Sequence, residues 1–114
     1  MSWTMCTSGA AFARAGVHAN PAAIDYMDAW STQAEGLIEA ETGMSIKSNF
    51  AGYALSGAAS MACAAQIAMN VITYDTRVYI AREADTLLNM NDTDYKTAIK
   101  NMKDYSKTTL SNPN

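Results

Sequence analysis

Two carboxylates one helical turn apart, Glu35 and Glu39, come closest of all residues in this chain to the spacing of a chemical centre. Side chains four positions apart on a helix project from the same side, so this pair could share a metal ion. A dinuclear carboxylate site also needs Glu-x-x-His pairs on other helices. The one histidine, His18, precedes the predicted long helices. A metal enzyme is therefore a minor hypothesis, and an acidic helix face is the better interpretation.

Motifs for nucleophilic or phosphate chemistry are missing from the sequence. There is no Gly-x-Ser-x-Gly motif, no second histidine for a triad, and no phosphate-loop or dinucleotide glycine pattern. Cys6 and Cys63 stand far apart without a CxxC motif or a neighbouring histidine, which predicts two free, reduced thiols. We expect no enzymatic activity and no metal or other cofactor.

Charged residues are instead collected into two stripes of opposite sign. Four of the eight basic residues recur at steps of four, three and four, and acidic residues recur earlier at steps of three, seven and four. These steps place each set on one side of a helix. We predict that both stripes are contact surfaces for other proteins. The acidic stripe is Asp25, Asp28, Glu35 and Glu39, and the basic stripe is Lys96, Lys100, Lys103 and Lys107.

The basic stripe has three interpretations: a solvated helix face, a protein interface, or a contact for nucleic acid or phosphate. A net charge of −3 and a pI near 4.9 argue against a general nucleic-acid binder. No aromatic residues are interleaved with the lysines on that face, as stacking on single strands would require. A small nucleic-acid-binding or regulatory protein that uses these lysines is the alternative function.

Length and composition predict one globular domain with one core. The chain has 114 residues, of which 49% are hydrophobic and 17% charged, with only two prolines. The uncharged stretch from Ser48 to Tyr74 contains Asn49, Gln66 and Asn70, which makes it too polar for a membrane span. The first six residues lack a basic segment and a continuous apolar segment, so we expect no signal peptide and no membrane association.

Local signals predict where helices begin and end. Thr7 or Ser8 can cap a short helix that Gly16 ends, and Asn20-Pro21 begins a long helix that Gly43 ends. Further helices are expected from Leu55 to about Asp75, from Ala81 to Met90, and from a cap at Asn91 or Asp92 onward. The expected core stripe of the first long helix is Ile24, Met27, Trp30, Ala34, Leu37 and Ile38, and that of the last is Tyr95, Ala98, Ile99, Met102, Tyr105 and Leu110.

The predicted fold is all-α, a small bundle of about four helices with an irregular N-terminal arm. Residues 1–20 form the arm, residues 21–110 the helical domain, and residues 111–114 a polar tail.

The segment Asp28–Gly43, DAWSTQAEGLIEAETG, resembles the first long helix of small head-tail connector proteins of tailed bacteriophages, also called adaptor or head completion proteins. The resemblance lies in its acidic "IEAxTG"-type end. A loop, an Ala-rich central helix and a final amphipathic segment follow in the order of that family. The resemblance covers roughly Ile24 to Leu110.

This resemblance implies a structural virion protein, an all-helical subunit of a homo-oligomeric ring between the portal and the tail. Its partners would be the portal protein and tail-side neck or tail proteins. The ring would line the channel for passing genomic DNA without sequence-specific binding. The protein would be synthesised in the bacterial host cytoplasm and reside in the virion neck. Opposite charge stripes would favour head-to-tail packing of subunits, and acidic residues in the channel would repel phosphates.

Overall fold

The computed structural model describes residues 4–16, 19–75, 79 and 82–111, with side chains for all of these except 49 and 106–111. Within these residues four α-helices follow one another: α1 (Ser8–Ala15), α2 (Ile24–Thr42), α3 (Ser56–Tyr74) and α4 (Glu83–Ser111). Short 3-10 turns at Pro21–Ala23 and Lys47–Asn49 flank α2. The described part of the chain contains no strand, and the predicted all-α fold is confirmed.

The predicted caps of the first two helices are confirmed. The Thr7 side chain accepts a hydrogen bond from the backbone N–H of Ala10 at 3.2 Å, and Gly16 ends α1 with φ +95°. The Asn20 side chain accepts from the Ala22 N–H at 2.9 Å and opens the 3-10 turn that leads into α2. Gly43 ends α2 in the left-handed conformation, with φ +70°, which glycine adopts at little cost.

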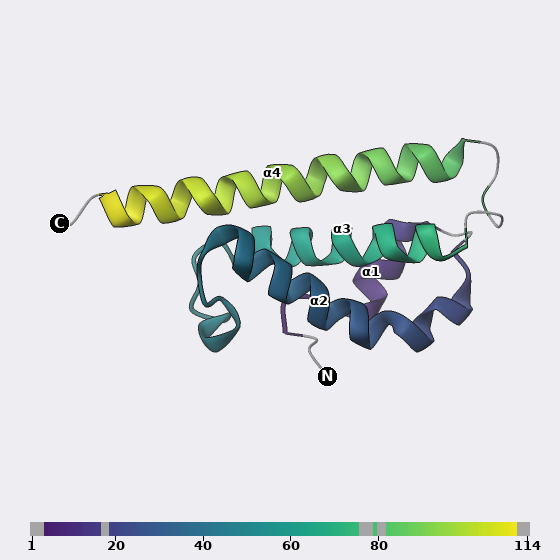
Figure 1. Cartoon of the computed structure of the whole chain (residues 1–114), viewed down its shortest axis with the longest axis horizontal. Helices are drawn as coiled ribbons and strands as arrows, with labels where there is room; N and C mark the ends of the chain where they lie inside the picture. The colour runs from purple at the N-terminus through teal and green to yellow at the C-terminus, as the bar shows by residue number, and fades with distance from the viewer. Residues whose placement is uncertain (1–3, 17–18, 76–78, 80–81, 112–114) are drawn as a thin grey trace.

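Helix α3 is the centre of the bundle. It packs against α1, α2 and α4, and Figure 1 shows it lying between α4 on one side and α1 and α2 on the other. Its buried residues are mostly small, which lets neighbouring backbones approach closely: Ala59, Ala62, Cys63, Ala64, Ala65, Ile67, Ala68, Val71 and Ile72. The prediction of a central helix buried on several sides is confirmed.

The N-terminal segment contributes to this core. Met5, Ala11 and Ala15 are buried in the same hydrophobic cluster as the residues of α3, and α1 packs directly on α3. Residues 4–16 are therefore packed into the bundle and do not form a separate arm.

The chain has one long helix where the sequence predicted two. Helix α4 runs unbroken for 29 residues, so the predicted cap at Asn91 or Asp92 is wrong. No glycine or proline interrupts this segment, and the Asn91 side chain is engaged elsewhere. At a rise of about 1.5 Å per residue, α4 is about 43 Å long and α3 about 28 Å. The C-terminal end of α4 therefore continues past α3 (Figure 1).

Both predicted core stripes are partly correct. In α2, Ile24 and Leu37 lie on the surface, at 56% and 41% exposed, while the rest of the stripe is buried or half-buried. In α4 the stripe is buried from Tyr95 to Met102, but Tyr105 is exposed and the side chain of Leu110 lies outside the described residues. Among the described residues, no helix is long and apolar enough to cross a membrane.

Candidate functional site

The acidic stripe of α2 is divided between surface and interior. Asp25 and Asp28 are exposed on its first turns. Glu39 is half-buried and accepts a hydrogen bond from the Lys47 N–H at 2.8 Å. Glu35 is fully buried, and its Oε2 accepts from the backbone N–H groups of Thr4 at 2.8 Å and Met5 at 2.7 Å. The prediction of Glu35 as a surface contact is therefore wrong, because its carboxylate holds the N-terminal segment.

Those bonds also change the interpretation of Glu35 and Glu39 as paired ligands. Each carboxylate is an acceptor for the backbone of a segment that packs beside α2. Within the described ranges, no group of three or more His, Cys, Asp and Glu side chains is placed to hold a metal ion. His18 lies outside those ranges.

The basic stripe lies on the exposed side of α4 and is interleaved with acids. Lys96 forms an ion pair with Asp92 at 2.9 Å, and Lys100 forms one with Asp104 at 3.0 Å. Lys103 is exposed and has no ion pair with any described residue. The backbone of Lys107 continues the helix, but its side chain is not among those described. We call Lys96, Lys100 and Lys103 the basic face.

A groove of about 590 Å³ borders the basic face. Leu37 and Glu41 of α2, Gln66 of α3 and Tyr95 of α4 contribute to its wall. The Tyr95 hydroxyl donates to Glu41 Oε2 at 2.8 Å, and burial together with this carboxylate raises the pKa of Tyr95. The basic face therefore combines lysine ammonium groups with a partly apolar hollow.

A second surface, which the sequence did not indicate, lies where α2 begins and α3 ends. Ile24, Tyr26 and Tyr74 are all exposed, and the ring of Tyr26 lies 5.3 Å from that of Tyr74 and 5.9 Å from that of Trp30. Asp25 and Asp28 are exposed on the same turns of α2, on a side of the helix next to the one that carries Tyr26, so acids and rings together surround this end of α2. We call Ile24, Asp25, Tyr26, Asp28 and Tyr74 the acidic aromatic surface.

An apolar groove of about 750 Å³ adjoins this surface. Phe12, Ala13, Ala19 and Pro21 line it together with Ile24. Exposed aromatic rings beside an apolar hollow are typical of the anchors that dominate binding at protein interfaces. The sequence indicates these exposed tyrosines only weakly: Tyr26 lies outside the core stripe of α2, and Tyr74 is the last residue of α3.

The two surfaces lie toward opposite ends of an elongated molecule. The structure measures 53 × 28 × 17 Å along its principal axes. In Figure 1, α2 begins and α3 ends on one side, while the C-terminal half of α4 extends to the other. The acidic aromatic surface and the basic face are therefore separated along the long axis.

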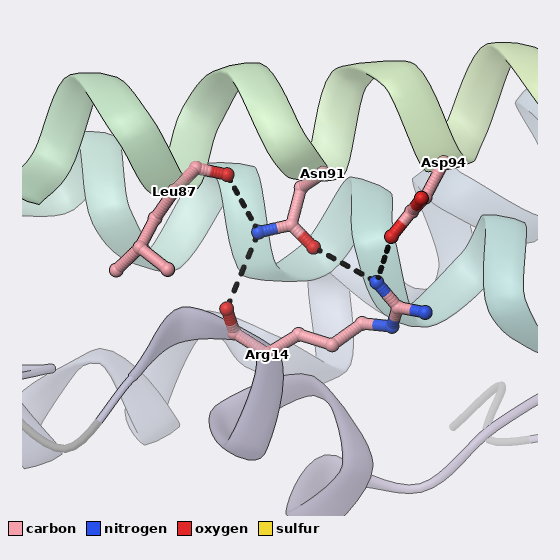
Figure 2. Close-up of polar contacts among 4 residues, drawn as sticks. All are labelled: Arg14, Leu87, Asn91 and Asp94. Atoms are coloured by element: carbon pink, nitrogen blue, oxygen red, sulfur yellow. Dashed lines mark hydrogen bonds and ion pairs between the residues drawn. The ribbon is translucent and has the colours of Figure 1, made fainter.

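A network between α1 and α4 fixes how these helices pack (Figure 2). The Arg14 guanidinium donates to Asp94 Oδ2 at 2.8 Å and to Asn91 Oδ1 at 3.2 Å. Asn91, which is buried, donates in return to the backbone carbonyls of Arg14 and Leu87. The carbonyl of Ala15 accepts from the Tyr79 hydroxyl at 2.8 Å. Carbonyls at the end of α1, which have no partner within that helix, are thus satisfied by side chains from elsewhere.

Comparison of this chain with protein-family models, with curated proteins and with solved structures finds no match.

Proposed function

We propose that this protein is a non-enzymatic structural subunit that assembles with copies of itself head to tail. The observation that carries the proposal is the separation of two complementary surfaces along the long axis. One is acidic and aromatic, and the other is basic and grooved. A contact between unlike surfaces on neighbouring copies is heterologous, and it generates a ring when the rotation between subunits closes.

The charges on the two surfaces favour this arrangement over a twofold dimer. Asp25 and Asp28 of one copy would face Lys100 and Lys103 of the next. Contacts between two acidic or two basic surfaces would be repulsive. The ion pairs of Lys96 and Lys100 with acids of their own helix reduce the net charge of the basic face, so the attraction is moderate. The exposed rings of Tyr26 and Tyr74 would supply the apolar part of the contact.

We further propose that this assembly is a head-tail adaptor ring in the neck of a tailed bacteriophage virion. The resemblance of Asp28–Gly43 to such proteins and the helix order support this assignment. The ring would bind the portal on one side and neck or tail proteins on the other, and genomic DNA would pass through it. Acidic residues that line the channel, outside the contacts between copies, would repel phosphates and keep DNA from adhering.

Size-exclusion chromatography with light scattering on the purified chain tests self-assembly, and co-sedimentation with portal particles tests the adaptor role. We expect concentration-dependent oligomers and co-sedimentation. A chain that stays monomeric at high concentration and does not co-sediment with portal particles would overturn both proposals. Oligomers that do not bind portal particles would support the self-assembly proposal and overturn the adaptor assignment.

The alternative function, nucleic-acid binding through the basic face, predicts a different result. DNA affinity would fall steeply with salt and would drop in the Lys100→Glu, Lys103→Glu variant. The ion pairs on this face disfavour that function, because Asp92 and Asp104 would also approach the phosphates. Salt-independent binding, or none, would exclude it.

A further inference from the structure

The segment immediately before α1 is held from two sides. Its backbone N–H groups at Thr4 and Met5 donate to the buried Glu35 of α2. The backbone carbonyl of Met5 accepts from the Ser60 hydroxyl of α3 at 2.5 Å. We call residues 4–7 the strap, because these bonds carry it across both helices.

The strap brings two cysteines together that are 57 positions apart in the sequence. Cys6 follows Met5, and Cys63 lies one turn beyond Ser60 on the same side of α3. Cys6 packs against the hydrophobic cluster that contains the buried Cys63, and both are free thiols. The Ser60 bond to Met5 is an independent observation that places the strap over this turn of α3.

The two thiols differ in access to solvent. Cys63 is fully buried. Cys6 is partly exposed in the wall of a surface hollow of about 470 Å³, beside Ser60, Met61 and Ala64. A small reagent can therefore reach Cys6 before it reaches the buried Cys63.

The two thiols also differ in acidity. The hydrogen bond from Cys63 lowers the pKa of the Cys6 thiol. The same bond, followed by burial, raises the pKa of the Cys63 thiol. Since the thiolate is the nucleophile, Cys6 is the thiol that attacks and Cys63 the thiol that resolves.

We propose that Cys6 and Cys63 form a site of reversible oxidation, at which a disulfide locks the strap onto α3. The oxidant is a small disulfide such as oxidised glutathione. The Cys6 thiolate attacks one of its sulfurs, forms a mixed disulfide and releases one glutathione thiolate. Cys63 then loses its proton and attacks the sulfur of Cys6, releasing the second glutathione. Two protein thiols are oxidised, and one glutathione disulfide is reduced to two thiols.

The state of this oxidation site depends on the compartment in which the protein resides. In a reducing cytoplasm both thiols persist, and the strap is held by hydrogen bonds alone. In an oxidising medium the disulfide closes a loop of more than fifty residues, which restricts the unfolded chain. The inference rests on the strap and its thiols, and it stands whether or not the chain assembles.

The test is to incubate the reduced, full-length chain with oxidised glutathione under native conditions. We expect an intact mass lower by two hydrogens, a Cys6–Cys63 peptide in the digest, and a melting temperature raised on the order of 10 °C. A reductant should reverse all three. A stable mixed disulfide at Cys6, links between separate chains, or a Cys6–Cys63 bond formed only in denaturant would overturn the proposal.

Two variants separate the roles of the thiols. Cys63→Ala should stop at one glutathione on Cys6, and Cys6→Ala should react slowly or not at all. If Cys63→Ala does not fold, timed alkylation of the wild-type chain gives the same information. Cys6 should be labelled first and Cys63 should remain protected, and equal labelling rates would contradict the assigned order.

Discussion

At the residue scale, Tyr53 and Tyr95 form a matched pair that tests how buried hydroxyls contribute to stability. The buried Tyr53 hydroxyl has no hydrogen-bond partner among the described residues, whereas the Tyr95 hydroxyl donates to Glu41. Tyr53→Phe should leave the free energy of unfolding unchanged or raise it by up to about 1 kcal/mol, because it removes a desolvated hydroxyl without a partner. Tyr95→Phe should lower it by about 1 kcal/mol. Urea denaturation measures both, and equal losses would contradict the assignment.

Tyr95 also makes the stability of the folded protein sensitive to alkaline pH. Burial, then the bond to Glu41, raises the pKa of Tyr95 above its ordinary value of 10.0, and burial also raises the pKa of Tyr53 and Tyr79. A raised pKa means that the unfolded chain releases this proton first. The stabilisation is therefore complete below pH 10.0 and is lost as pH rises toward the pKa of the folded state.

Denaturation curves at a series of alkaline pH values should accordingly show a falling free energy of unfolding. The fall should be shallower in Tyr95→Phe, which has one fewer proton to lose. Tyr26→Phe is the matched control, because that ring is 51% exposed. A Tyr95→Phe slope equal to that of the wild-type chain would contradict the prediction.

The burial of Glu35 could not be predicted from helix spacing alone. Its position in the acidic stripe follows from helix periodicity. The same periodicity correctly predicted that Asp25 and Asp28 lie on the surface. Its burial depends on Thr4 and Met5, which lie about thirty positions earlier and pack there only in the folded chain. The proximity of Cys6 to Cys63 has the same origin, because it depends on tertiary packing of a segment without periodic structure.

At the element scale, helix ends were predicted well where the signal is local. The caps at Thr7 and Asn20 and the glycine at Gly43 act through their own neighbours, so the sequence contains the whole signal. The break predicted before α4 failed because Asn91 can form its hydrogen bonds in two ways. It can cap a helix, or it can remain inside one and bond to another element. The carbonyl of Arg14, on α1, selects the second.

Asn91 is therefore predicted to stabilise the contact between α1 and α4. Asn91→Ala should lower the free energy of unfolding by about 1–3 kcal/mol, because it leaves the Arg14 carbonyl without this partner and the Arg14 guanidinium with one acceptor fewer. Amide hydrogen exchange in α1 should accelerate more than in α3. Asn89→Ala, on the exposed side of the same helix, is the control and should change the stability by less than about 0.5 kcal/mol. Equal effects would show that Asn91 acts only through helix propensity.

At the scale of the whole molecule, the hydrophobic pattern was sufficient for the fold class but insufficient for the surfaces. Periodicity identified α3 as the buried helix, because nearly its whole circumference is apolar or small. The acidic aromatic surface could not be predicted, because Ile24 fits the core stripe of α2 by spacing, yet at the start of that helix its side chain is 56% exposed. The length by which α4 exceeds α3 could not be predicted either, because the sequence indicated a break inside α4.

Reversing charges on the two surfaces tests the head-to-tail arrangement directly. Asp25→Lys with Asp28→Lys makes both surfaces positive, and Lys100→Glu with Lys103→Glu makes both negative. Each double variant alone should remain monomeric at low salt, because every contact between copies would join like charges. An equimolar mixture should assemble, since positive and negative subunits can alternate. The variant with all four reversals should assemble alone, because it again carries one surface of each sign.

Light scattering at low and high salt measures these outcomes, and circular dichroism confirms that each variant is folded. Lys100→Glu places like charges beside Asp104 one turn away, a cost of only about 0.5 kcal/mol to the helix. Loss of assembly in that double variant therefore reports on the contact between copies rather than on unfolding. If the mixture and the fourfold variant both stay monomeric, the two surfaces are not partners. If all variants assemble as the wild-type chain does, the contact is apolar, and Ile24 and Tyr26 become the residues to substitute.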